Sequence, residues 1–174
     1  NWVSGKKDGE GILKTSFGDE YDGSWKNDFK SGFGHIIFSD GDEYRGQWLN
    51  GIIEGEGKYL FVSGDNCEGT FLDGKLNGQG LFNYSNGDKY IGSFLMGKRQ
   101  GKGTCEFSNG EKYTGEWKND IINGVGYYVF LNGNHYEGNF EDGIMNGQGT
   151  YTYKNGNLYI CLLYTSPSPR DFQV

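Results

Sequence analysis

The chain is poor in proline and cysteine, and it has no long apolar run. It contains two prolines and three cysteines in 174 residues. An odd number of cysteines without metal-like spacing (Cys67, Cys105 and Cys161) argues against both a disulfide framework and a zinc site. We therefore expect a reducing, intracellular and cytoplasmic setting. Because no stretch of about 18 apolar residues occurs, the sequence does not predict a membrane-spanning helix.

Positive charge is also in short supply, since the formal net charge is −7. Proteins that bind nucleic acid usually present a basic face, so we expect no nucleic-acid partner. The same deficit removes any general attraction to an anionic membrane surface, and membrane lipid is therefore not a favoured partner.

Glycine and aromatic residues are abundant instead. The chain has 32 glycines, and aromatic side chains make up 17% of it. So much glycine without a collagen triplet is typical of disordered chains. Disordered segments lack aromatic residues, however. We therefore interpret the glycines as structural residues that separate strands rich in aromatic side chains.

The sequence repeats every 23 residues without gaps. Six complete repeats cover 21–43, 44–66, 67–89, 90–112, 113–135 and 136–158. Residues 1–20 fit the same frame with its first three positions missing, and 159–160 open one more repeat. We predict a single array over residues 1–160 and number the positions of each repeat from 1 to 23.

Each repeat contains two stretches that alternate with the period of a β-strand. Positions 1 to 6 place Tyr21, Gly23 and Trp25 on one face of a strand. A second alternation covers positions 14 to 19. In the repeat 21–43 it begins at Gly34, and its last large apolar residue is Phe38.

Asn-Gly and Asp-Gly pairs predict where the chain turns, because tight hairpin turns need positive φ. We expect one connection at Asn77-Gly78 and Asn123-Gly124, and the other at Asp40-Gly41 and Asn86-Gly87. Each repeat is then a β-hairpin. The predicted fold is all-β: an elongated, single-layer antiparallel sheet of stacked hairpins.

A glycine recurs at position 3, between two large side chains on one face. Glycine weakens a strand unless something must approach it closely. We infer that Gly23 and its equivalents leave room for an aromatic ring to lie flat against the backbone. Because an isolated hairpin is marginal in water, the repeats must stabilise one another.

The frame Y-x-G-x-W-x-x-G, with a later G-x-G and an N-G or D-G turn, resembles the MORN repeat (membrane occupation and recognition nexus). The departures are small: Cys67 replaces the first Tyr, and Asp28 and Asp120 replace Gly at position 8. The resemblance implies a sheet with a groove and a non-catalytic scaffold, often in ciliary, cytoskeletal or membrane-junction assemblies. Because open sheet edges invite pairing, we expect more repeats, a cap or another subunit to cover the ends of the sheet.

The pattern stops at Cys161. Residues 161–174 hold both prolines and no glycine, and they resemble translated cloning or sequencing adaptor. We interpret this tail as non-native or disordered, and we expect the natural protein to continue beyond both ends.

The aromatic positions 1, 5 and 18 are the candidate partner-binding residues, because exposed aromatic area in a groove marks interaction sites. The candidates are Tyr44, Trp48, Phe61, Phe71, Tyr84, Tyr90, Phe94, Phe107, Tyr113, Trp117, Phe130, Tyr136, Phe140 and Tyr153. The alternative is that these rings only form the core. Apolar residues at positions 9 and 10, such as Ile52 and Ile53, suggest a second contact strip at one hairpin end.

Position 22 carries a row of acidic residues followed by asparagine. The row is Asp19, Asp42, Asp65, Asp88, Glu111, Asn134 and Asn157. Turn chemistry explains it most simply, because Asp and Asn bond nearby backbone groups in turns. The alternatives are an acidic ridge that faces a basic partner or, less favoured, a calcium site.

No catalytic, metal or cofactor site is predicted. His35 and His135 occupy different repeat positions, and GKRQGKGT at 97–104 lacks the spacing of a phosphate loop. The sequence thus predicts a non-enzymatic scaffold that holds a partner segment within a larger complex, which the resemblance makes ciliary or cytoskeletal. The alternatives are a peripheral phospholipid-binding module and the targeting arm of a larger enzyme.

Overall fold

A computed structural model describes residues 1–163, and these residues contain strands and turns but no helix. The strands are β1 (Trp2–Val3), β2 (Lys6–Lys7), β3 (Gly9–Lys14), β4 (Glu20–Lys26), β5 (Phe29–Ile37), β6 (Glu43–Leu49), β7 (Ile52–Leu60), β8 (Asn66–Leu72), β9 (Lys75–Asn83), β10 (Lys89–Leu95), β11 (Lys98–Glu106), β12 (Lys112–Lys118), β13 (Ile121–Val129), β14 (His135–Glu141), β15 (Ile144–Thr152) and β16 (Leu158–Leu163). Residues 164–174 of the predicted tail lie outside the described residues.

Within residues 1–163, β3 to β16 follow one another in chain order in one open antiparallel sheet of 14 strands. This arrangement confirms the predicted all-β sheet of consecutive hairpins. The short pair β1–β2 aligns Trp2 with Lys7 and corresponds to positions 5 to 10 of the incomplete first repeat.

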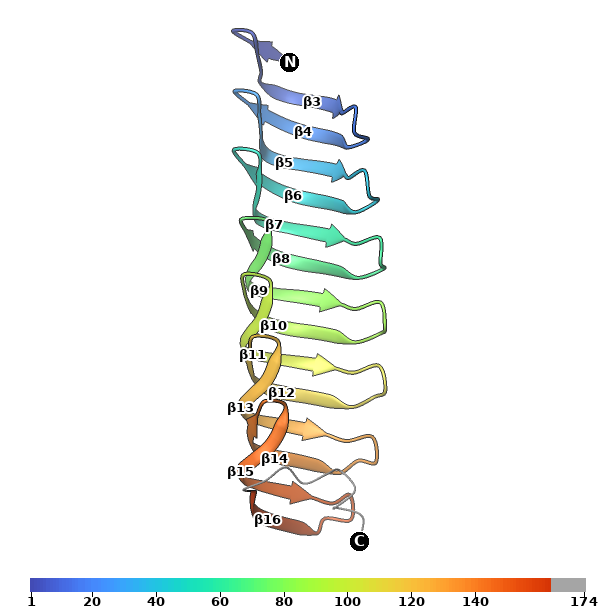
Figure 1. Cartoon of the computed structure of the whole chain (residues 1–174), viewed down its shortest axis with the longest axis vertical. Coiled ribbons are helices and arrows are strands. Elements are labelled where there is room, and N and C mark those ends of the chain that lie inside the picture. The colour runs from blue at the N-terminus through green and yellow to red at the C-terminus, as the bar shows by residue number, and fades with distance from the viewer. Residues whose placement is uncertain (164–174) are drawn as a thin grey trace. The chain divides into compact units, whose positions relative to one another are not determined.

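The chain divides into two compact units. The first comprises Asn1–Ser85 with Phe94–Gly97, and the second comprises Asn86–Ser93 with the residues from Lys98 onward. Within each unit, consecutive strands are joined alternately at the two ends of the strands (Figure 1).

The first turn of each repeat lies at positions 7 and 8, four residues before the predicted place. Both turn residues have positive φ, for example Asp73 at 49° and Gly74 at 74°. A two-residue hairpin loop of this kind matches the twist of its strands. The equivalent pairs are Asn27-Asp28, Asn50-Gly51, Met96-Gly97, Asn119-Asp120 and Asp142-Gly143.

The predicted connections at Asn77-Gly78 and Asn123-Gly124 were therefore wrong. These pairs lie inside β9 and β13, beside a register shift in the pairing with the preceding strand. Gly78 has a φ of 101° and Gly124 a φ of 85°. A bulge that places a glycine at positive φ has the same requirement as a tight turn, so the same sequence signal marks both.

The second turn lies where the sequence predicts it. Its residues are positions 18 to 22, so Phe38 begins this turn, one residue after β5 ends. The N–H of Phe38 donates to the carbonyl of Asp42 at 2.9 Å, and Gly41 has a φ of 96°.

The core is the face that carries positions 1, 3, 5, 10, 14 and 16. Its buried residues include Tyr21, Trp25, Ile36, Tyr44, Trp48, Ile53, Cys67, Phe71, Leu76, Tyr90, Phe94, Cys105, Tyr113, Trp117, Tyr136, Phe140 and Tyr151. The side chains of this face cover one another, since no second layer lies over the sheet in residues 1–163.

Candidate functional site

The tyrosines at position 1 lie flat across a pair of glycines. Gly46 and Gly57 stand opposite each other on β6 and β7. A Cβ on Gly57 would lie 2.5 Å from Cζ of Tyr44, so no side chain fits there. The Tyr44 hydroxyl then donates to the carbonyl of Gln47 at 3.1 Å.

The same arrangement occurs at the other tyrosines of position 1. Their hydroxyls donate to the carbonyl three residues later at 3.0–3.2 Å, in Tyr21, Tyr90, Tyr113 and Tyr136. The inference that the glycines make room for a ring is confirmed. Burial raises the pKa of Tyr21, Tyr44 and Tyr113 to about 12, because a buried phenolate would lose its solvation.

Each position-1 ring packs edge-to-face against rings at position 5. Tyr44 meets Trp48 of its own repeat at 5.5 Å between centroids and Phe71 of the next repeat at 5.3 Å. Such pairs contribute about 0.5–1.5 kcal/mol each beyond area burial. The rings of neighbouring repeats thus stabilise one another.

Nine of the fourteen candidate residues belong to this buried set. Each is at most 6% exposed: Tyr44, Trp48, Phe71, Tyr90, Phe94, Tyr113, Trp117, Tyr136 and Phe140. Rings this deeply buried can support a binding surface, but they expose almost no area of their own to a partner.

Position 10 covers these rings with an aliphatic or a cationic side chain. Ile53 and Leu76 are buried there. In another repeat, Lys30 Nζ lies 4.6 Å from the Trp48 ring centroid, and burial lowers the pKa of Lys30. Arg99 lies 4.2 Å from the Trp117 ring centroid and pairs with Asp120. The predicted contact strip at positions 9 and 10 is therefore divided, because Ile53 belongs to the core while Ile52 is exposed.

The other five candidates lie in a second row of rings, at positions 16 and 18, which we call the aromatic strip. In the first unit the strip comprises Phe38, Tyr59, Phe61, Phe82 and Tyr84, and in the second unit Phe107, Tyr128, Phe130, Tyr151 and Tyr153. All are half-buried except Tyr151, which is buried. The strip includes the candidates Phe61, Tyr84, Phe107, Phe130 and Tyr153.

Rings of neighbouring repeats alternate along the strip. Phe38 stacks on Tyr59 of the next repeat at 6.0 Å between centroids, and Tyr59 meets Phe61 at 4.4 Å. The position-16 rings were missing from the sequence candidates. Their alternation with positions 14 and 18 could have identified them, but Ile36 and Cys105 at the same position hide the pattern.

The position-22 residues, which we call the acidic row, are tied to the strip. Asp42 accepts hydrogen bonds from the Tyr59 hydroxyl at 3.0 Å and from the Val62 N–H at 2.9 Å. Glu111 likewise accepts from the Tyr128 hydroxyl at 2.8 Å. Turn chemistry therefore accounts for this row. Each acid accepts a hydrogen bond from the turn of the following repeat, and some also accept one from their own turn, as Asp65 does from the Ser63 hydroxyl at 2.9 Å.

Hydrogen bonds favour the charged form of Asp65 in this row. The backbone hydrogen bond from Ser85 lowers the pKa of Asp65, because the N–H stabilises the carboxylate. Burial and the hydrogen bond to Asp42 raise the pKa of Tyr59, so the phenol stays neutral beside the carboxylate.

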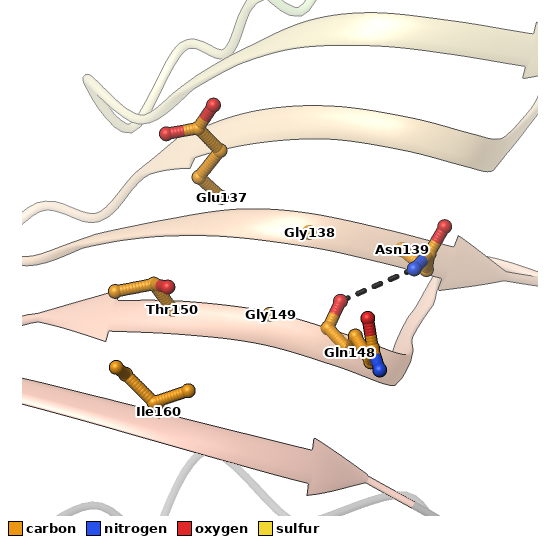
Figure 2. A pocket seen from close by; sticks show the side chains of 7 residues that line it. All are labelled: Glu137, Gly138, Asn139, Gln148, Gly149, Thr150 and Ile160. Atoms are coloured by element: carbon orange, nitrogen blue, oxygen red, sulfur yellow. Dashed lines mark hydrogen bonds between the residues drawn. The ribbon is translucent and has the colours of Figure 1, made fainter.

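The opposite face of the second unit has a shallow pocket of about 670 Å³. Figure 2 shows Gly138 and Gly149 at its centre, with Glu137 and Thr150 to one side and Asn139 and Gln148 to the other. The Asn139 amide donates to the Gln148 carbonyl at 3.2 Å. Thr150 stands opposite Glu137 in the pairing of β14 with β15, but no hydrogen bond joins its hydroxyl to the carboxylate, so this pair is not arranged as an activated nucleophile.

The two cysteines whose side chains are described lie in the core. Cys67 and Cys105 are buried and unpaired with each other, and burial raises the pKa of their thiols to about 12 and about 11. Residues 1–163 hold no group of three or more metal-ligating side chains. They also contain no helix of the length and apolarity that a membrane crossing requires.

Comparisons with solved structures find a similar fold at low identity. The TCP domain of SAS-4 (dCPAP) of Drosophila melanogaster, in complex with a proline-rich motif of Ana2 (dSTIL), superposes with a TM-score of 0.53 at 14% identity, covering 87% of this chain and 88% of that chain. The TCP10 domain of Danio rerio CPAP matches with a TM-score of 0.33 at 11% identity, covering 92% and 85%. No curated protein matches the sequence.

The family comparison gives a clear assignment. The MORN repeat model matches residues 1–16, 21–43, 44–66, 67–89, 90–112, 113–135 and 136–158, in the same frame as the 23-residue repeat. With its glycine pairs, position-1 tyrosines and consecutive hairpins matched over most of its length, the chain belongs to the MORN repeat family.

Proposed function

We propose that this chain is a non-catalytic interaction scaffold that binds an extended segment of a partner protein along the aromatic strip. The observation that carries the proposal is the row of rings, half-buried except for Tyr151, that each unit carries on a single-layer sheet. Partly exposed apolar area of this kind marks interaction sites, and aromatic residues are enriched at protein interfaces.

The fourteen sequence candidates take two roles in this proposal. Phe61, Tyr84, Phe107, Phe130 and Tyr153 contact the partner, while the nine buried rings fix the shape of the sheet beneath. The similar TCP domain is described in complex with a proline-rich motif, and this supports binding of a peptide-like segment to a sheet of this fold.

A place in a larger assembly is part of the proposal, and the family resemblance supports a ciliary or cytoskeletal one. A phospholipid-binding module is the weaker alternative, because the net charge of −7 repels anionic headgroups. A targeting arm of a longer enzyme is compatible with the same strip, because the strip itself performs no chemistry.

The test selects peptides on the intact chain. A displayed library of random 12-residue peptides is panned against wild type, and the recovered peptides are measured by fluorescence anisotropy against two variants. Phe61→Leu with Phe130→Leu removes two strip rings but keeps apolar volume. Phe33→Ser is the control, because Phe33 is 60% exposed on the opposite face.

We expect the strip variant to weaken binding at least tenfold and the control to leave it unchanged. Circular dichroism verifies that both variants keep the fold. Charged substitutions at buried rings such as Tyr90 and Trp117 would not test the strip, because they would place a charge in the core and unfold the chain. Recovered peptides that bind the strip variant as well as wild type would refute the proposal, as would a library that yields no binder.

A further inference from the structure

We propose that the bound segment is a polyproline II helix that advances three residues per repeat and directs basic side chains at the acidic row. This inference rests on the proposed function, since it names the conformation and charge of the segment that the aromatic strip takes.

The spacing of the repeat carries the first step. Adjacent strands lie about 4.8 Å apart, so two strands bring the next equivalent ring about 9.6 Å along the sheet. A polyproline II helix has three residues per turn and rises about 3.1 Å per residue, or about 9.3 Å per turn. Every third residue of such a segment therefore meets an equivalent ring, with a drift of only about 0.3 Å per repeat.

Other conformations fit the spacing less well. In an extended β-strand, side chains on one face recur about every 6.7 Å, which falls between successive rings. In an α-helix the nearest match is seven residues, or about 10.5 Å, and the mismatch of about 0.9 Å grows with each repeat. Polyproline II is the regular conformation whose period matches the array.

The length of the strip in each unit sets the length of the segment. The first unit presents three position-18 rings (Phe38, Phe61 and Tyr84), and the second unit presents Phe107, Phe130 and Tyr153. Three rings correspond to residues i, i+3 and i+6 of the bound segment. The aromatic lining suits this conformation, because polyproline segments dock on aromatic grooves with little loss of entropy.

The charge beside the rings carries the second step. In the first unit, Asp42 and Asp65 are half-buried, and the hydrogen bond from Tyr59 holds the Asp42 carboxylate next to the strip. In the second unit the row changes from Asp88 and Glu111 to Asn134 and Asn157. A segment with one Arg or Lys per turn complements the first unit fully and the second unit at its acidic end.

The experiment compares three fluorescein-labelled peptides with equal charge. The first is (Pro-Pro-Arg)3, which has the proposed conformation and period. The second is (Gly-Gly-Arg)3, which keeps the charge spacing but loses the preformed helix. The third is (Pro-Pro-Pro-Arg)3, which keeps the helix but places arginine at every fourth residue. Anisotropy titrations on the whole chain measure Kd at low and at physiological salt.

The protein variants are matched for charge. Asp42→Asn with Asp65→Asn removes two charges from the acidic row. Asn occurs naturally at this position, where Asn134 accepts the Lys154 N–H at 3.0 Å, so the turn bonds are kept. Glu56→Gln with Glu68→Gln removes two exposed charges from the opposite face as the control.

We expect (Pro-Pro-Arg)3 to bind at least tenfold more tightly than either other peptide. The Asp42→Asn, Asp65→Asn variant should weaken it about tenfold and flatten its salt dependence, while the control should change it less than twofold. Phe61→Leu should weaken binding as well, which places the peptide on the strip.

Two results would overturn the inference. If all three peptides bind equally, neither the polyproline II conformation nor the three-residue period determines binding. If (Pro-Pro-Arg)3 does not bind at 1 mM, basic polyproline segments are not the ligand. If displayed peptides of another kind still bind in a manner that depends on Phe61, the proposed function stands and only this inference fails.

Discussion

Repeats 44–66 and 67–89 differ at position 1, where the side chain packs on the glycine pair and on neighbouring rings. In the first, the Tyr44 ring covers the glycine pair and its hydroxyl closes a hydrogen bond with Gln47. In the second, Cys67 has no ring to offer. The glycine pair of that repeat lies instead against Leu76 and the Phe94 ring, each about 3.3 Å from where a glycine Cβ would stand.

The backbone responds to this difference. Gly69 has a φ of 152°, whereas the equivalent Gly46 does not have φ in the left-handed range. The tyrosine thus fixes the conformation of the strand that carries it. Neighbouring side chains can fill the space when the ring is missing, so a single replacement leaves the sheet continuous.

The largest effect is expected when the position-1 tyrosine of a regular repeat is replaced by the cysteine found in repeat 67–89. Tyr44→Cys removes a fully buried ring, two edge-to-face partners and a hydrogen bond, and should lower the free energy of unfolding by about 3–5 kcal/mol. Urea denaturation followed by tryptophan fluorescence measures it. A loss below about 1 kcal/mol would show that neighbours replace the ring at no cost.

The second prediction compares two glycines at position 14. Gly57→Ala forces a methyl group into the Tyr44 ring and should cost about 2–3 kcal/mol. Gly80→Ala meets its nearest atoms at 3.2–3.3 Å, which small shifts can relieve, and should cost less than about 1 kcal/mol. Equal unfolding midpoints for the two variants would contradict the role assigned to the tyrosine.

The third prediction restores the missing ring. Cys67→Tyr should raise the free energy of unfolding by about 1–2 kcal/mol, because it adds buried area and a hydrogen bond. Leu76 and Phe94 must move aside, which limits the gain. Cys67→Ser serves as the control, since it removes the thiol without adding a ring, and it should not stabilise the chain.

The smallest effect concerns pH. The pKa of the Cys67 thiol is raised to about 12, so the thiol ionises first in the unfolded chain. Its contribution to stability is full below about pH 9 and is lost as the pH rises toward 12. For a tyrosine at the same position, such as Tyr44, the corresponding loss of stability begins only near pH 10. Between pH 8 and 9.5, wild type should therefore lose slightly more stability than Cys67→Tyr, as measured by urea midpoints.

Much of the fold could be predicted from the sequence because the repeat is strict. The 23-residue period, the alternation around Trp25 and the Asp40-Gly41 turn each indicate one structure. The first turn could not be placed, because Asn77-Gly78 and Asp73-Gly74 both satisfy the requirement for positive φ. Only the pairing of β8 with β9 distinguishes the bulge from the turn.

The candidate site was harder to predict. Alternation assigns Trp48 and Phe61 to a face but does not say which ring covers which. That depends on how side chains of neighbouring repeats stack, and in the structure Trp48 is 6% exposed while Phe61 is half-buried. The position-16 rings, such as Tyr59, are equally regular, but Ile36 and Cys105 interrupt their pattern.

The acidic row has a consequence for how such a chain can change in length. The carboxylate of Asp65 accepts the N–H of Ser85, which lies in the turn 20 residues later, and Asp42 does the same for Val62. Each of these repeats therefore provides an acceptor to the turn of the next repeat, and its own turn donates to the position-22 residue of the preceding repeat. Duplicating or deleting a whole repeat preserves every such bond, whereas inserting one residue breaks them. Internal gene duplication can thus lengthen the array without requiring any compensating substitution.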